Sequence, residues 1–155
     1  MSEHAFDTVF RTPLGRMGLA LEADAVSGLV WVGDDVRLEK PASGVAHDYV
    51  EQIQAYFESA QQYPVLPLRL KGTRFQQTVW NALREIPTGE VVTYGWLAAH
   101  LGSGSRAIGQ ACRSNRITLL VPCHRVVAWN HSGGYMGRNA RLDIKEWLLR
   151  HEGAV

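Results

Sequence analysis

The sequence predicts a mixed α/β protein of the α+β kind, with a small antiparallel sheet and one helix in its N-terminal part and a mainly helical C-terminal part. Apolar and polar residues alternate over residues 8–32 around Gly15 and Gly28, as in strands joined by tight turns. Apolar residues then recur at helical spacing over residues 45–60, which predicts one amphipathic helix. Capping and turn residues divide the chain after residue 67 into several short helices.

A domain boundary is predicted between residues 66 and 67, giving an N-terminal sheet domain over 1–66 and a second domain over 67–155. Pro64 and Pro67 interrupt the helical pattern there. The charge also changes sign, because residues 1–66 hold four Lys/Arg against ten Asp/Glu, whereas the remainder holds twelve against five. With 46% apolar and 20% charged residues in a chain of 155, an intrinsically disordered protein is excluded.

No apolar run reaches the roughly 18 to 20 residues that a membrane helix needs. The first thirty residues carry acids and lack the apolar core of a signal peptide. We therefore expect a cytoplasmic protein with no membrane partner. The two cysteines, Cys112 and Cys123, are too few for a disulfide scaffold and are expected to be thiols in a reducing compartment.

The C-terminal part carries a helix-turn-helix pattern. Thr73 to Gln76 form a capping box before a helix that ends at Pro87. Thr93 can cap a helix over Tyr94–Leu101, Gly102 suits its C-terminal cap, and a second short helix runs from Arg106 to about Arg113. Residues 103–142 contain no acid and six arginines, which are suited to phosphate contacts: Arg106, Arg113, Arg116, Arg125, Arg138 and Arg141. A solvated charged face is the alternative for such a run.

Ile117 to Val121 form a continuous apolar run, which predicts a buried strand or extended segment. The run leads into Cys123 and His124, and after a glycine-rich loop a final helix carries apolar residues from Leu142 to Leu148.

Cys123 next to His124 is a candidate nucleophile and base. An apolar setting raises the pKa of a thiol, so a reactive thiolate needs help, which an imidazole can supply. The imidazole would in turn be oriented by a carboxylate. The acids near the end of the chain are Glu152, Asp143 and Glu146, of which Glu152 ends the terminal helix. A buried structural thiol is the alternative; a metal site with Cys112 is disfavoured because no short Cys-x-x-Cys spacing exists.

The motif Pro122-Cys123-His124-Arg125-Val126-Val127 resembles the O6-alkylguanine-DNA alkyltransferases. The resemblance covers about residues 68–153, and Thr12-Pro13-Leu14-Gly15 is weakly similar. The other matching segments follow in the family's order: Phe75-Gln76, Val79-Trp80, Ile86-Pro87, Gly89-Glu90, Thr93-Tyr94-Gly95, Arg106-Ala107-Ile108-Gly109, Asn115, Gly134-Tyr135 and Lys145-Glu146-Trp147-Leu148-Leu149. This resemblance implies a ribonuclease H-like N-terminal domain and a winged-helix-like DNA-binding domain.

The resemblance implies a DNA repair enzyme that reverses damage directly in double-stranded DNA. A single irreversible step would move the alkyl group of O6-alkylguanine, and of O4-alkylthymine, to Cys123. His124 would act as base through a water, with Glu152 on its other nitrogen. Tyr94 would donate a proton to N3 of the base, and Asn115 would brace the turn before the cysteine segment; an ordinary core aromatic and a helix-terminal cap are the alternatives for these two.

For DNA, the resemblance implies a recognition helix in the minor groove, with Arg106 filling the space of the flipped nucleotide. A plain phosphate contact is the alternative for Arg106. Ala107 and Gly109 would permit close approach, and Arg113 and Arg116 would add positive charge. The base pocket would be formed by Val126, Gly134, Tyr135 and Met136. No metal and no cofactor are expected, and the protein is expected to be a monomer.

The sequence departs from the family pattern at Arg116, where proline is common, at the bulky Trp129, and in a longer segment between Tyr135 and Lys145. Three other functions remain open. A lesion-binding protein of the same architecture would lack the nucleophile, a helix-turn-helix regulator would need a dimer, and a cysteine hydrolase would need an oxyanion hole.

Overall fold

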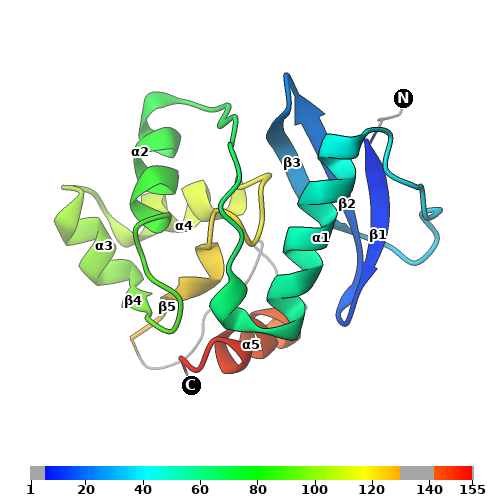
Figure 1. The fold of residues 1–155 in the computed structure, drawn as a ribbon. Helices are drawn as coiled ribbons and strands as arrows, with labels where there is room; N and C mark the ends of the chain where they lie inside the picture. The colour runs from blue at the N-terminus through cyan, green and yellow to red at the C-terminus, as the bar shows by residue number, and fades with distance from the viewer. Residues whose placement is uncertain (1–5, 130–141, 155) are drawn as a thin grey trace. The chain divides into compact units, whose positions relative to one another are not determined.

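The computed structural model describes residues 6–129 and 142–154 (Figure 1). It confirms the predicted fold class, with a small three-stranded antiparallel sheet and a mainly helical second part. The contacts divide the chain into two compact units, Met1–Lys71 with Arg116–Leu120, and Gly72–Asn115 with Val121–Val155. The boundary between residues 66 and 67 stays a prediction.

The first unit is built on strands β1 (Thr8–Thr12), β2 (Gly15–Glu22) and β3 (Ala25–Val32), which pair in that order. Met17 on β2 lies opposite Phe10 on β1 and Trp31 on β3. Helix α1 (Gly44–Glu58) begins at Ser43, whose hydroxyl accepts a hydrogen bond from the backbone of Ala46, and the short helix η1 (Ala60–Gln62) follows it. Sheet and helix share a core of fully buried side chains: Met17, Leu19, Leu29, Ile53 and Tyr56.

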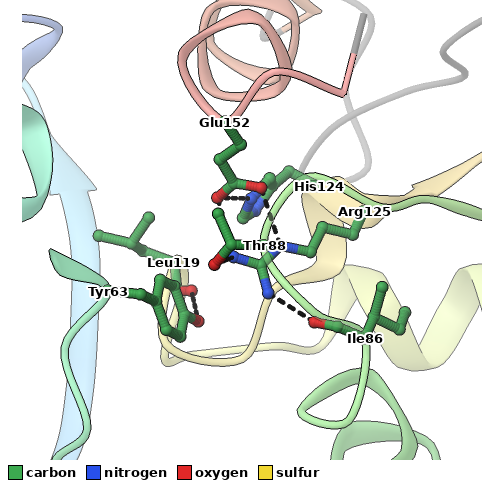
Figure 2. Close-up of polar contacts among 7 residues, drawn as sticks. All are labelled: Tyr63, Ile86, Thr88, Leu119, His124, Arg125 and Glu152. Carbon is green, nitrogen blue, oxygen red and sulfur yellow. Dashed lines mark hydrogen bonds and ion pairs between the residues drawn. The ribbon is translucent and has the colours of Figure 1, made fainter. Parts of the chain in front are cut away.

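The apolar run Ile117–Val121 is buried as predicted, but it is not a strand. Ile117 forms one bridge with Leu29, and the chain then turns at Leu119, whose φ of 73° is left-handed. Thr118 donates to the carbonyl of Leu29 from both its backbone and its hydroxyl, and the hydroxyl of Tyr63 donates to the carbonyl of Leu119 (Figure 2). Apolar composition predicts burial, and here hydrogen bonds within the first unit pair part of the buried backbone although the run forms no strand.

The second unit contains α2 (Arg74–Leu83), β4 (Val92–Thr93), α3 (Tyr94–His100), α4 (Ser105–Arg113), η2 (Cys123–Arg125), β5 (Val126–Val127) and α5 (Leu142–His151). The capping box at Thr73 and Gln76 is present, and the hydroxyl of Thr93 caps α3. Gly102 has the left-handed φ of 65° that ends α3. Within this unit β4 and β5 pair in parallel (Figure 1), so the tyrosine that opens α3 and the strand that follows the cysteine segment are neighbours.

The indole nitrogen of Trp80 on α2 donates to the carbonyl of Ala111 on α4 at 2.8 Å. Together with the buried side chains of Leu97 and Ile108, this bond fixes α4 against the two preceding helices and leaves its other face to solvent. In the described ranges, no helix is long and apolar enough to cross a membrane.

Candidate active site

Cys123 lies at the start of η2, and its side chain is almost completely buried, at 4% exposure. The amide of Asn115 donates to its Sγ at 3.4 Å and to the carbonyl of Val121 at 2.9 Å. Burial raises the pKa of the Cys123 thiol, while the Asn115 hydrogen bond and the charge of Lys145 act in the opposite direction. The sulfur therefore holds its proton at neutral pH, and a reaction through it requires a base.

His124 is fully buried, and its Nε2 lies 2.9 Å from Oε2 of Glu152. Burial lowers the pKa of this imidazole more than the nearby carboxylate raises it. Because an ionised carboxylate only accepts hydrogen bonds, Nε2 carries the proton and Nδ1 keeps a lone pair. Among the described residues Nδ1 has no hydrogen-bond partner, so the ring is a neutral acceptor of the kind that a general base must be.

Arg125 completes this cluster, although its sequence context, the motif after Cys123 and an acid-free stretch of arginines, predicted at most a phosphate contact for it. Figure 2 shows its guanidinium facing Glu152, with Nε 2.9 Å from Oε1 and Nη2 2.9 Å from Oε2. It also donates to the carbonyl of Ile86 at 2.6 Å and to the hydroxyl of Thr88 at 3.1 Å. At 1% exposure, Arg125 holds the carboxylate and does not face phosphate.

Lys145 and Tyr94 lie near the two thiols. Lys145 on α5 is fully buried, its Nζ donates to the carbonyl of Val126 at 2.7 Å, and it lies 5.7 Å from the ring centroid of Tyr94. Burial lowers the pKa of Lys145 to about 8. Burial, with the charges of Cys112 and Cys123, raises the pKa of Tyr94, so its hydroxyl keeps its proton and can donate it in a hydrogen bond.

Lys145 opens the motif Lys145-Glu146-Trp147-Leu148-Leu149, and no role for it was predicted from the sequence. One feature of the sequence could have indicated a role for Lys145. It lies on the apolar face of the predicted helix, between Ile144 and Leu148, where a lysine is rarely found unless it is paired or functional.

Replacing Lys145 by methionine is expected to remove one pH dependence of stability. Between about pH 8 and 10.5 the unfolded chain holds a proton that the folded chain has lost, so this group makes the folded state more stable as pH rises through that window. In urea unfolding, the free energy of unfolding of the natural chain should therefore rise relative to that of the K145M variant by up to about 1.4 kcal/mol per pH unit within this window. R150M, an exposed change on the same helix, is the control and should give a pH-independent difference.

Helix α4 presents the predicted DNA-contacting residues. Arg106 and Arg113 are exposed, and Ala107 and Gly109 are half-buried. A Cβ added at Gly109 would meet no atom within 4 Å, so the surface there is open. Arg116 is also exposed, but it groups with the first unit, where its carbonyl accepts from the backbone of Leu29.

Comparisons with known proteins agree with this geometry. Residues 74–154 match the family model described as 6-O-methylguanine DNA methyltransferase, DNA binding domain. A methylated-DNA–protein-cysteine methyltransferase of Methanosarcina acetivorans is 38% identical over 94% of this chain and 97% of its own length. The chain belongs to the 6-O-methylguanine DNA methyltransferase family. The predicted resemblance is thereby confirmed.

Further methyltransferases are similar over the whole chain. The constitutive methylated-DNA–protein-cysteine methyltransferase of Bacillus subtilis is 38% identical over 94% of this chain and 93% of its own length. The crystal structure of the Mycobacterium tuberculosis O6-methylguanine methyltransferase is similar with a TM-score of 0.80 and 31% identity, covering 97% of this chain and 94% of that one. The structure of the OGT of the same bacterium in complex with DNA is similar with a TM-score of 0.80 and 33% identity, covering 94% of this chain and 91% of that one.

Three expected base-pocket residues of this methyltransferase, Gly134, Tyr135 and Met136, lie outside the described residues. The fourth, Val126, is fully buried, and its carbonyl accepts a hydrogen bond from Lys145. A carbonyl has a second lone pair, so this oxygen can accept from a further donor.

In the described part of the methyltransferase, one group of side chains offers closely spaced metal ligands. His47, Asp48 and Glu51 on α1 bring their ligand atoms within 4.8 Å of one another, but all three are exposed. The group belongs to the first unit, and Cys123 and His124 are not part of it.

Proposed function

We propose that this chain repairs double-stranded DNA by moving the alkyl group of O6-alkylguanine, and also of O4-alkylthymine, to Sγ of Cys123 in one irreversible step. Relatives similar over nearly the whole chain are named methylated-DNA–protein-cysteine methyltransferases, and DNA repair by alkyl transfer follows from that similarity. The observation that carries the assignment to Cys123 is its buried position beside a neutral histidine with a free acceptor nitrogen.

The transfer is a displacement at the alkyl carbon. His124 Nδ1 takes the thiol proton through a bridging water, since no hydrogen bond joins ring and sulfur in the described part of the chain. The new S–C bond forms as the bond from carbon to O6 breaks, and the electron pair returns to the base. The hydroxyl of Tyr94 donates to N3, which limits the negative charge on the leaving guanine. The raised pKa of Tyr94 supports a role as hydrogen-bond donor.

We propose that α4 enters the minor groove and that Arg106 fills the space left by the flipped nucleotide. Its exposure, and the open surface at Gly109, support this contact. Arg113 and Arg116 would bind phosphate. Val126, Gly134, Tyr135 and Met136 would form the pocket for the flipped base. One monomer would act on each lesion, in the cytoplasm and without a cofactor.

The stoichiometry of repair tests this function. A duplex with a single O6-methylguanine, supplied in excess, should lose the lesion only until one equivalent per protein chain has reacted, because the thioether is stable. Chromatography of the digested DNA measures the remaining lesion, and an unmodified duplex is the control for binding.

The alternatives give different results. A lesion-binding protein would retain the modified duplex and remove nothing, whereas a regulator would bind without preference for the lesion. Continued turnover beyond one equivalent would contradict the transfer to a cysteine.

A further inference from the structure

We propose that Arg125 is a positioning residue for the alkyl transfer, because it holds Glu152 so that this carboxylate fixes His124 as a neutral imidazole with Nδ1 free to accept a proton. The inference rests on the proposed function and extends it to a residue that touches neither DNA nor the sulfur.

The carboxylate of Glu152 accepts hydrogen bonds from two side chains, those of Arg125 and His124. Both carboxylate oxygens accept from Arg125, and Oε2 also accepts from Nε2 of His124. The guanidinium is anchored on its other side by the carbonyl of Ile86 and the hydroxyl of Thr88 (Figure 2). The position of Glu152 is therefore set by the turn after α2, acting through Arg125, and the ring of His124 follows the carboxylate.

The charges explain why this matters for a base. A carboxylate alone beside a histidine favours the imidazolium form, typically by one to three pKa units, and an imidazolium cannot take a proton from a thiol. The charged and titratable groups that act on His124 are Glu152, Arg125 and Lys145, with Cys123 adjacent in the chain. Burial is the main cause that lowers the pKa of His124, and the charges of Arg125 and Lys145 lower it further. Of these two cations, Arg125 is the one that contacts the carboxylate directly.

A simpler alternative is that Arg125 only ties the end of α5 to the turn at Thr88. Both ideas predict a less stable protein when Arg125 is replaced. They differ in the protonation of His124, which a purely structural tie would leave unchanged.

The test compares R125M, which removes the charge, with R125K, which keeps it. The control is T88V, which breaks the bond to Arg125 without touching Glu152. Single-turnover transfer to Cys123 is followed from pH 5 to pH 9. In R125M the midpoint of the rising limb should move to higher pH by about one unit or more, and R125K and T88V should stay near the natural profile. A rate lowered equally at every pH in R125M would overturn the proposal.

A second measurement needs neither variants nor DNA. Nitrogen NMR of the natural protein should show His124 at pH 7 as a neutral ring with its proton on Nε2. An imidazolium, or a proton on Nδ1, would overturn the proposal even if R125M failed to fold. Since this spectrum is independent of alkyl transfer, its outcome is distinguishable from a failure of the proposed function.

Discussion

Replacement of Cys123 by alanine is expected to abolish alkyl transfer completely and to leave binding to alkylated DNA essentially unchanged. The change removes the sulfur that bonds to the alkyl carbon in the proposed reaction, whereas Arg106 and the other exposed residues of α4 remain. Transfer is measured with labelled methyl groups, and binding with a duplex that contains O6-methylguanine.

The matched control is C112A, because Cys112 is the other cysteine of the chain and is also buried. Burial, with the charge of Cys123, raises the pKa of its thiol, so it is expected to act as a small core residue of α4. C112A should transfer one methyl group per chain, as the natural protein does. If transfer persisted in C123A and disappeared in C112A, the alkyl acceptor would be Cys112, and the proposal for Cys123 would be wrong.

Replacement of Glu152 by alanine is expected to destabilise the protein by about 3–5 kcal/mol, because it leaves a buried guanidinium without its carboxylate. Arg125 is 1% exposed and His124 fully buried, so neither can turn to solvent without disrupting η2. The free energy of unfolding is measured by denaturant titration at pH 7.

For this second variant the control is E146A, which removes an exposed carboxylate from α5 and should change stability by less than about 0.5 kcal/mol. Equal and small effects of E152A and E146A would mean that the cluster of Glu152, Arg125 and His124 is not maintained in solution. Alkyl transfer by E152A, measured below its unfolding midpoint, should also be lost, because His124 no longer has an oriented ring.

The sequence predicted the elements whose local signals are strong. Strand alternation around Gly15, the capping box at Thr73 and the left-handed position of Gly102 each depend on a few neighbouring residues, and each is present. The turn at Leu119 was missed because an apolar run reports burial without reporting backbone direction.

The candidate site divides along the same line. Cys123 and His124 could be predicted from the sequence because they are adjacent, and Glu152 could be predicted because it ends the last helix. The roles of Arg125 and Lys145 could not be predicted, because they depend on partners far away in the sequence. Arg125 bonds to Ile86 and Thr88, and Lys145 lies over the ring of Tyr94. A charged residue in an acid-free stretch suggests exposure, and only the tertiary contacts show that Arg125 is buried.

Trypsin provides the most direct test of the account. Cleavage after Arg116 and Arg125 places Cys123 on residues 117–125, and cleavage after Arg106 and Arg113 places Cys112 on residues 107–113. After incubation with duplex DNA containing O6-methylguanine, mass spectrometry should find one methyl group on the first peptide and none on the second. A methyl group on the second peptide, or two unmodified peptides beside intact lesions, would contradict the transfer to Cys123.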